Sequence, residues 1–307
     1  MSLISKLKGA GPSGFGGNST AEEVTEGLDL RGKTYLITGC GSGLGKETMR
    51  VLAMRGAKVL GTARSLERAR TAMEEVGATD AVPLVCELAD PASVRACVAE
   101  VERLGVTLDA IICNAGVMAM PKRQTAHGYE LQFFTNHVGH FMLVTGLLDR
   151  LSPTGRVVML TSAAHRGAPS VGIRLDDLGA ERSYGAWDAY SQSKLANILF
   201  ANELARRFDG TGRTANSVHP GVIVTELWRH LPRFANSAIK AVTPLFLKTP
   251  EQGAATTCYV ATHPSLEKVS GRYFIDCNVA ETSARGRDAE LARKLWERTE
   301  QIVAGLP

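Results

Sequence analysis

Residues 34–45 read Thr-Tyr-Leu-Ile-Thr-Gly-Cys-Gly-Ser-Gly-Leu-Gly, and this stretch decides the fold class. Its first half is apolar and β-prone, and its glycine cluster leads into a run with a helical pattern. A strand, a tight glycine turn and a helix N-terminus together favour a dinucleotide pyrophosphate, because the backbone can approach the phosphates and the helix offers unpaired N–H groups. Glycine-rich turns are common, so the rest of the chain must decide what this one binds.

Strand and helix signals alternate after residue 28. Short apolar runs predict strands near 34–38, 57–62, 81–86, 108–113, 155–161, 213–218 and 271–276, and the helical pattern recurs near 44–55, 66–76, 91–104, 127–150, 187–208, 250–262 and 287–304. Buried parallel strands read as continuous apolar runs, and their alternation with helices indicates right-handed βαβ units. The sequence therefore predicts a single Rossmann-type doubly wound α/β domain, with a central parallel sheet of about seven strands and helices on both faces.

Two segments depart from this alternation. Residues 1–28 are rich in Gly, Ser and Pro and predict a flexible N-terminal arm, which leaves 29–307 as the dinucleotide-binding domain. Residues 222–250 are long, contain Pro232 and Pro244, and predict a lid-like insertion between two strands. Its apolar side chains either roof an apolar substrate pocket or pack onto the core or a second subunit; they are Leu227, Trp228, Leu231, Phe234, Ile239, Val242, Leu245, Phe246 and Leu247.

Composition narrows the class of protein. The chain is 44% hydrophobic and 21% charged, as soluble globular proteins are, and its net charge of +4 is too small to indicate a nucleic acid or a membrane surface as partner. Six scattered cysteines without a CxxC pair favour reduced thiols and a cytoplasmic location. No run reaches the roughly 20 apolar residues that a membrane span requires, so no span is expected.

The end of the second predicted strand bears on which dinucleotide is bound. An acidic residue is expected there for the ribose 2′-hydroxyl of NAD, but Ala63 takes its place and Arg64 and Ser65 follow. A guanidinium without a competing carboxylate suits a 2′-phosphate. NADP(H) is therefore favoured over NAD(H), although Arg64 could also be an ordinary surface arginine.

Two further turns follow predicted strands. Asn114-Ala115-Gly116 closes the fourth strand, and His219-Pro220-Gly221 closes the sixth, with Thr225 shortly after. The carboxyl ends of parallel strands line the ligand crevice, so both turns are expected beside the cofactor. A simple Asn-Ala-Gly loop exit and a plain Pro-Gly turn are the alternative explanations.

Tyr190 and Lys194 begin a helical run at a spacing of four, so their side chains share one helix face. A nearby cation stabilises phenolate, which would lower the Tyr190 pKa from about 10 toward neutrality and make it a general acid/base. Ser162 ends the fifth strand at the crevice, where its hydroxyl can bind a substrate carbonyl. Asn136, in the preceding long helix, either holds a water that relays protons from Lys194 or simply faces solvent.

The histidines offer little support for a metal. His137 and His140 share a helix face, but no cysteine or carboxylate cluster completes a site, so no metal is expected. Loop or surface positions are expected for His127, His165, His230 and His263.

Together these motifs resemble the short-chain dehydrogenase/reductase family over about residues 29–300. The matching elements are Thr38-Gly39, Gly43-x-Gly45, Asn114-Ala115-Gly116, Asn136, Ser162, Tyr190-x-x-x-Lys194 and Pro220-Gly221. The stretches 128–132, 135–141, 249–254 and 270–274 are more similar to the branch that holds retinol dehydrogenases, the WW-domain oxidoreductase and protochlorophyllide reductase. That branch usually uses NADP(H).

The resemblance implies a catalytic set of Asn136, Ser162, Tyr190 and Lys194. Ser162 and Tyr190 would bind the carbonyl oxygen, Tyr190 would transfer the proton, Lys194 would lower its pKa and bind the ribose, and Asn136 would complete the relay. Glu87-Leu88 departs from the family's usual Asp-Leu or Asp-Val, which alters the expected adenine contact. The cofactor is expected to contact Gly39, Ser42, Gly43, Leu44, Gly45, Arg64, Ser65, Glu87, Leu88, Asn114, Ala115, Gly116, Tyr190, Lys194, Pro220, Gly221, Val222 and Thr225.

The predicted function is an NADP(H)-dependent oxidoreductase, a carbonyl reductase or alcohol dehydrogenase acting on a small, hydrophobic carbonyl or alcohol substrate. A non-catalytic NADP(H) sensor or interaction protein is the alternative. The helical regions 127–150 and 187–208 carry apolar stripes, and many relatives associate through the equivalent pair, so a homodimer or homotetramer is also considered.

Overall fold

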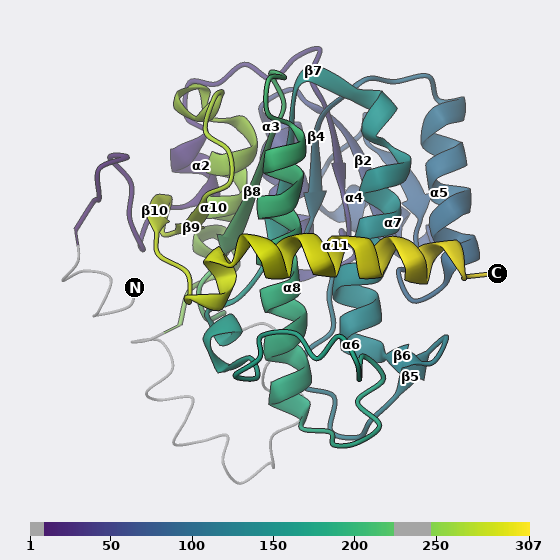
Figure 1. The fold of residues 1–307 in the computed structure, drawn as a ribbon. Coiled ribbons are helices and arrows are strands. Elements are labelled where there is room, and N and C mark those ends of the chain that lie inside the picture. The colour runs from purple at the N-terminus through teal and green to yellow at the C-terminus, as the bar shows by residue number, and fades with distance from the viewer. Residues whose placement is uncertain (1–8, 224–246) are drawn as a thin grey trace, which may run out of the picture.

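A computed structural model describes residues 9–223 and 247–307. Figure 1 shows a central sheet with helices on both faces. The strands of this sheet are β1 Thr34–Ile37, β2 Lys58–Ala63, β3 Val82–Val85, β4 Leu108–Cys113, β7 Leu151–Leu160, β8 Thr214–His219, β9 Tyr273–Ile275 and β10 Asn278–Ala280. Their order across the sheet is β10-β9-β8-β7-β4-β1-β2-β3. The predicted doubly wound α/β fold is confirmed.

The position of β1 defines where ligands bind. It pairs in parallel with β2 on one side and with β4 on the other, so the direction of winding reverses between β1 and β4. Doubly wound sheets bind their ligands outside the carboxyl ends of the strands at this switch point. The glycine turn that follows β1 therefore lies at the expected place.

The sheet has eight strands rather than about seven. The additional strand, β10, pairs antiparallel with β9 through a turn at Asp276 and Cys277, which have φ of 52° and 62°. Hairpin turns with positive φ at both central residues are normally marked by Asn-Gly or Asp-Gly. Cysteine in the second position removes that mark, which is why the hairpin was not predicted.

The helices form two layers (Figure 1). Their bounds are α2 Ala21–Val24, α3 Gly43–Met54, α4 Leu66–Glu75, α5 Pro91–Arg103, α6 Leu131–Phe133, α7 Gly139–Gly146, α8 Ala186–Arg207, α10 Pro250–Thr262 and α11 Ala289–Ala304. Helices α2, α3, α4 and α10 share one apolar core with the sheet, and α5, α7, α8 and α11 cover the other face.

The helix predicted at 127–150 is interrupted. A small ribbon of β5 Thr125–Ala126 and β6 Tyr129–Glu130 comes first, and α6 is followed by a π-helical turn, η1 Phe134–Val138, then α7 and the 3-10 turn η2 Leu148–Arg150. In the wide turn, the N–H of Gly139 donates to the carbonyl of Phe134, five residues earlier. Such turns are frequent at functional sites, and this one carries Asn136.

Residues 9–28, expected to be a flexible arm, contain ordered structure that packs on the domain. Thr20 and Glu23 form a reciprocal capping box for α2, and Ala21 is fully buried in the core. Ser13 N donates to Asn278 Oδ1 at 3.0 Å, and Asn278 Nδ2 donates to the Phe15 carbonyl at 2.9 Å. Local composition missed these anchors because their partners lie far along the chain.

Helix α11 runs across α8 on the outer face (Figure 1). Its Trp296 is buried and stacks on Phe200 with ring centroids 5.5 Å apart, while the Arg207 guanidinium lies 4.0 Å from the indole. The chain's own C-terminal helix thus packs against part of the apolar stripes that were considered for a second subunit. Among the helices that the structure describes, none combines the length and the apolar character needed to cross a bilayer.

Most of the expected lid-like insertion, including Thr225 and the apolar residues from Leu227 to Phe246, lies outside the described residues. The two described ends lie side by side. Ile223 and Lys248 form a parallel bridge, and Lys248 N donates to the Val222 carbonyl at 2.8 Å.

Candidate active site

Most of the site residues predicted from the sequence lie at the carboxyl ends of the central strands. Thr38 follows β1, Asn114 follows β4, Ser162 lies just beyond β7, and His219 ends β8. Helix α8 presents Tyr190 to the same region, and both Tyr190 and Lys194 are buried, with 8% and 5% of their surface exposed.

Three of the four predicted catalytic side chains adjoin one another. Ser162 hydrogen-bonds the Tyr190 phenol, and the Lys194 ammonium lies 5.7 Å from the centroid of the Tyr190 ring. Burial raises the pKa of Tyr190 to about 12, although the hydrogen bond from Ser162 lowers it. Lys194 was expected to bring this pKa toward neutrality, and the burial of the phenol acts in the opposite direction.

Lys194 is held at the end of β7. Its Nζ donates to the Leu160 carbonyl at 3.2 Å, and Asn197 Nδ2 donates to the same oxygen at 2.9 Å. Thr161 Oγ1 donates to the Lys194 carbonyl at 2.6 Å, which fixes this turn of α8 against the strand. Burial lowers the pKa of the Lys194 ammonium to about 8.

Asn136 joins the loop after β4 to α8. Its Nδ2 donates to the Val117 carbonyl and to Ser193 Oγ, each at 2.9 Å, and its Oδ1 accepts the Val117 N–H at 2.8 Å. A Cβ on Gly116 would lie 2.9 Å from Asn136 Oδ1 and 3.4 Å from Lys194 Nζ. The side chain is fully buried rather than facing solvent, and its amide positions the 114–117 loop beside Lys194.

His140 links three of these elements through a neutral imidazole. Its Nδ1 lies 2.9 Å from the Asn136 carbonyl, which can only accept, so Nδ1 carries the proton. Its Nε2 therefore accepts from the Thr38 hydroxyl at 2.9 Å, and Thr38 Oγ1 in turn accepts the backbone N–H groups of Asn114 and Ala115. Burial, with the nearby Lys194 charge, lowers the pKa of His140 to about 4, which keeps the ring neutral.

The glycine turn fits a phosphate group. Gly39 has a φ of 74°, and a Cβ on Gly45 would lie 2.3 Å from the Gly39 carbonyl oxygen, so only glycine permits this close turn. Ser42 is the N-cap of α3 but makes no side-chain cap hydrogen bond. The Ser42 side chain thus does not occupy the first N–H groups of α3, which lie at the positive end of a 12-residue helix.

Basic side chains flank that turn on the β2 side. Arg64 is exposed and forms no ion pair with any residue in the described ranges. Ser65 Oγ accepts the Arg68 N–H at 3.3 Å and caps α4. Arg68, which the sequence analysis did not single out, lies beside the turn, since its Cβ is 3.8 Å from the position of a Cβ on Gly41. Its place in the first turn of the helix that follows β2 was the available signal.

Glu87, the residue expected near the adenine, does not have a free carboxylate. Glu87 Oε1 accepts the Ala89 N–H at 3.2 Å, so this side chain is engaged by its own loop. Leu88 is buried, and its carbonyl oxygen would lie 2.3 Å from a Cβ on Gly139. The 87–88 position therefore contacts the first residue of α7 rather than standing alone at the edge of the sheet.

The turn after β8 is supported by an ion pair. Gly221 has a φ of 93°, and a Cβ there would lie 2.6 Å from Lys248 Cδ. Lys248 is buried, and its Nζ lies 2.6 Å from Asp276 Oδ1. Val222 is half exposed at the mouth of the same turn.

Three comparisons identify the family. The family model described as "short chain dehydrogenase" matches residues 33–173. The chain is 42% identical over 313 residues to the short-chain dehydrogenase TIC 32 B, chloroplastic, of Brassica napus, covering 97% of both chains, and 39% identical over 295 residues to human retinol dehydrogenase 14, covering 89% and 87%. A crystal structure of a protein from Mycobacterium paratuberculosis superposes with a TM-score of 0.74 at 32% identity, covering 92% and 97%.

The chain belongs to the short-chain dehydrogenase/reductase family. Its relatives place it in a retinol dehydrogenase-like branch, as the resemblance implied. Enzymes of this fold use a nicotinamide cofactor, and the glycine turn, the uncapped α3 and the 114–117 loop of this dehydrogenase/reductase supply a cradle that fits one.

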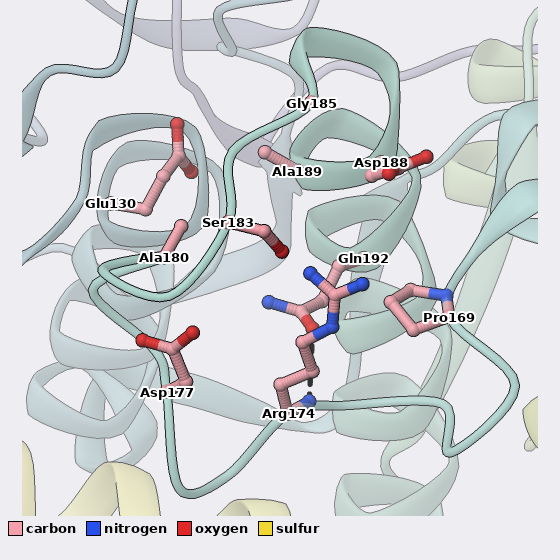
Figure 2. A pocket seen from close by; sticks show the side chains of 10 residues that line it. All are labelled: Glu130, Pro169, Arg174, Asp177, Ala180, Ser183, Gly185, Asp188, Ala189 and Gln192. Carbon is pink, nitrogen blue, oxygen red and sulfur yellow. Dashed lines mark hydrogen bonds between the residues drawn. The ribbon is translucent and has the colours of Figure 1, made fainter.

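Two hollows lined by described residues of the dehydrogenase/reductase lie away from the catalytic groups. Figure 2 shows a pocket beside the first turn of α8, in which Gln192 Oε1 accepts the Arg174 N–H at 2.9 Å. It encloses about 10 Å³, which is room for about one water. A second hollow of about 570 Å³ lies between the end of α8 and the start of α11. Neither is lined by Ser162 or Tyr190.

Sequence reasoning missed several histidine roles in this dehydrogenase/reductase. His165 was expected at a loop or surface position but is buried, with 1% of its surface exposed. His137 is also buried, and its Nε2 lies 3.0 Å from Thr299 Oγ1 of α11. Each partner is distant in sequence, so no local pattern could have indicated these contacts. His230 lies outside the described residues.

Proposed function

We propose that this dehydrogenase/reductase is an NADP(H)-dependent enzyme that transfers a hydride between the nicotinamide and the carbonyl or alcohol carbon of an apolar substrate. The observation that carries this proposal is the meeting of Ser162, Tyr190 and Lys194 at the strand ends beside the glycine turn. Such a group of hydroxyls and a cation is what carbonyl reduction requires of a protein.

The residues divide the work. The Ser162 and Tyr190 hydroxyls bind the carbonyl oxygen, and Tyr190 donates its proton to that oxygen during reduction. Its raised pKa keeps the phenol protonated at neutral pH, which is the form that reduction needs. The Lys194 ammonium lies over the Tyr190 ring, and the Asn136 amide holds the 114–117 loop in place. NADPH would supply the hydride when bound.

Preference for NADP(H) is supported by the β2 side of the turn. Ala63 leaves no carboxylate for the ribose, and Arg64 stands exposed with no ion pair in the described ranges. Arg68 and the hydroxyl of Ser65 lie on the adjoining first turn of α4. Two guanidinium groups suit a phosphate that carries up to two negative charges.

An apolar substrate is supported by Trp187. Its indole is 54% exposed, and its ring centroid lies 6.0 Å from that of Tyr190 at 81°. A large exposed aromatic surface next to the reacting phenol suits a hydrophobic carbonyl or alcohol. A cytoplasmic location is inferred from the six cysteines, all of which are free and buried.

The test is NADPH oxidation, followed spectrophotometrically, with a panel of apolar aldehydes and ketones. NADH in place of NADPH tests the cofactor preference, and Tyr190→Phe is the matched control because it keeps the ring and removes only the hydroxyl. We expect this variant to bind NADPH normally and to lose at least ~10²-fold in turnover. Tight NADPH binding without turnover of any carbonyl would instead favour the sensor.

A further inference from the structure

The peptide bond that follows Ser162 is held on both edges by histidine side chains. His165 Nδ1 lies 2.7 Å from the Ser162 carbonyl oxygen. The N–H of Ala163, at the other edge of the same peptide, donates to His219 Nδ1 at 3.3 Å. One imidazole comes from the 3-10 turn η3 Ala163–Gly167, and the other from the end of β8. The two contacts together fix the plane of this peptide.

These partners require opposite tautomers. A carbonyl oxygen only accepts, so His165 carries its proton on Nδ1, and its Nε2 accepts the Ser283 N–H at 3.1 Å. A backbone N–H only donates, so His219 has a bare Nδ1 and carries its proton on Nε2. A protonated ring would lose an acceptor at either residue, and hence one of these contacts.

The surroundings favour neutral rings. Both residues are buried, with 1% and 8% of their surface exposed, and burial lowers both pKa values, that of His219 to about 4. The charged and titratable groups that face His219 are Lys248, Asp276 and His165, and Arg166 faces His165. Lys248 and Arg166 add to the effect of burial, because a cation disfavours a second positive charge.

We propose that His165 and His219 are positioning residues that clamp the Ser162–Ala163 peptide and thereby aim the Ser162 hydroxyl at Tyr190. The Ser162 Oγ accepts the Ala164 N–H at 3.2 Å, so its proton stays free for the phenol or a carbonyl oxygen. Rotation of the clamped peptide would move this oxygen, and small misplacements of a catalytic group reduce rate strongly. The inference rests on the proposed function, since it concerns how that site is held.

If His165 had a purely structural role, its contacts with Ser283 and Tyr273 would matter more than its contact with Ser162. His165 also contacts Ser283 through Nε2 and packs edge-on against Tyr273, with ring centroids 5.3 Å apart. Asparagine places a polar atom near the Nδ1 position, and glutamine places one near Nε2. The pair His165→Asn and His165→Gln therefore separates the Ser162 contact from the Ser283 contact.

The experiment measures kcat and the KM for NADPH in the full chain. We expect His165→Gln and His219→Leu to lower kcat by ~10-fold or more with little change in KM, and His165→Asn and His219→Asn to recover most of kcat. Recovery by His165→Gln but not by His165→Asn would overturn the clamp. So would a kcat unaffected by His219→Leu.

A second measurement does not depend on turnover or on variants. ¹⁵N NMR of the histidine-labelled wild-type chain reports which ring nitrogen carries the proton. Bare Nε2 in His165 together with bare Nδ1 in His219 supports the clamp, and the same tautomer in both rings refutes it. Absence of carbonyl turnover in the wild type would refute the proposed function instead, so the two failures are distinguishable.

Discussion

Replacing Lys194 with methionine should stabilise the folded protein at pH 7 while removing a catalytic group. Burial lowers the pKa of this ammonium from 10.5 to about 8, so the folded state holds its charge at a cost. One pKa unit corresponds to 1.36 kcal/mol, which makes the cost on the order of 3 kcal/mol below pH 8. Methionine has a similar length and no charge. The Leu160 carbonyl keeps a donor in Asn197 Nδ2 at 2.9 Å, so the substitution strands no acceptor there.

The sign of the pH dependence follows from the same shift. Between pH 8 and 10.5 the unfolded chain binds more protons at Lys194 than the folded one does, so wild-type stability rises with pH in that window. Lys194→Met lacks this titration. The gain in free energy of unfolding of Lys194→Met over wild type should therefore be largest at pH 7 and shrink toward zero by about pH 10. Effects of Tyr190, which is present in both proteins, cancel in the difference.

Urea unfolding of both proteins without cofactor, at pH 7, 8, 9 and 10, measures this difference. Lys58→Met is the matched control, because Lys58 is exposed at the first position of β2. It should change stability by no more than about 0.5 kcal/mol at each pH. A Lys194→Met protein that is no more stable than wild type at pH 7, or whose advantage is independent of pH, would refute the reasoning.

Arg64→Leu should raise the KM for NADPH by ~10- to 100-fold and leave that for NADH unchanged, since a charge-assisted hydrogen bond contributes about 1.5–3 kcal/mol; steady-state kinetics with both cofactors checks this, and equal effects on both would contradict it. The kcat/KM for alcohol oxidation should rise from pH 7 to pH 10, because the raised pKa of Tyr190 leaves little phenolate at neutral pH; a flat profile would argue against Tyr190 as the base. Trp296→Ala should destabilise the protein by about 3–5 kcal/mol in chemical denaturation, because the indole is buried between Phe200 and Arg207; a loss below 1 kcal/mol would show that α11 contributes little.

The sheet was largely predictable because its central strands are buried on both faces. Continuous apolar runs such as 108–113 and 155–160, which lie between segments with a helical pattern, are best explained as buried strands. The features that escaped prediction have no such pattern. The π-helical turn at Phe134–Val138 keeps a continuous helical sequence, and its extra width shows only in the backbone hydrogen bonds.

The candidate site was predictable for a similar reason. Ser162 and Asn114 follow strands, and the spacing of Tyr190 and Lys194 is local, so sequence position alone brings them to the crevice. The state of the site was not predictable in this way. Whether the Tyr190 pKa rises or falls depends on burial by residues from several elements, and the partners of His140 become neighbours only after β1 and α7 have packed.

The anchoring of residues 13–15 by Asn278 determines when these contacts can form during translation. The hydrogen bond between Ser13 and Asn278 spans 265 positions, and Gln252 of α10 donates to the Asn18 carbonyl across 234. At ribosomal rates of about 5–20 residues per second, Ser13 is synthesised roughly 13–53 s before its partner. During translation the segment ahead of β1 must therefore wait without these contacts, exposed to proteases and chaperones, until almost the whole chain has emerged.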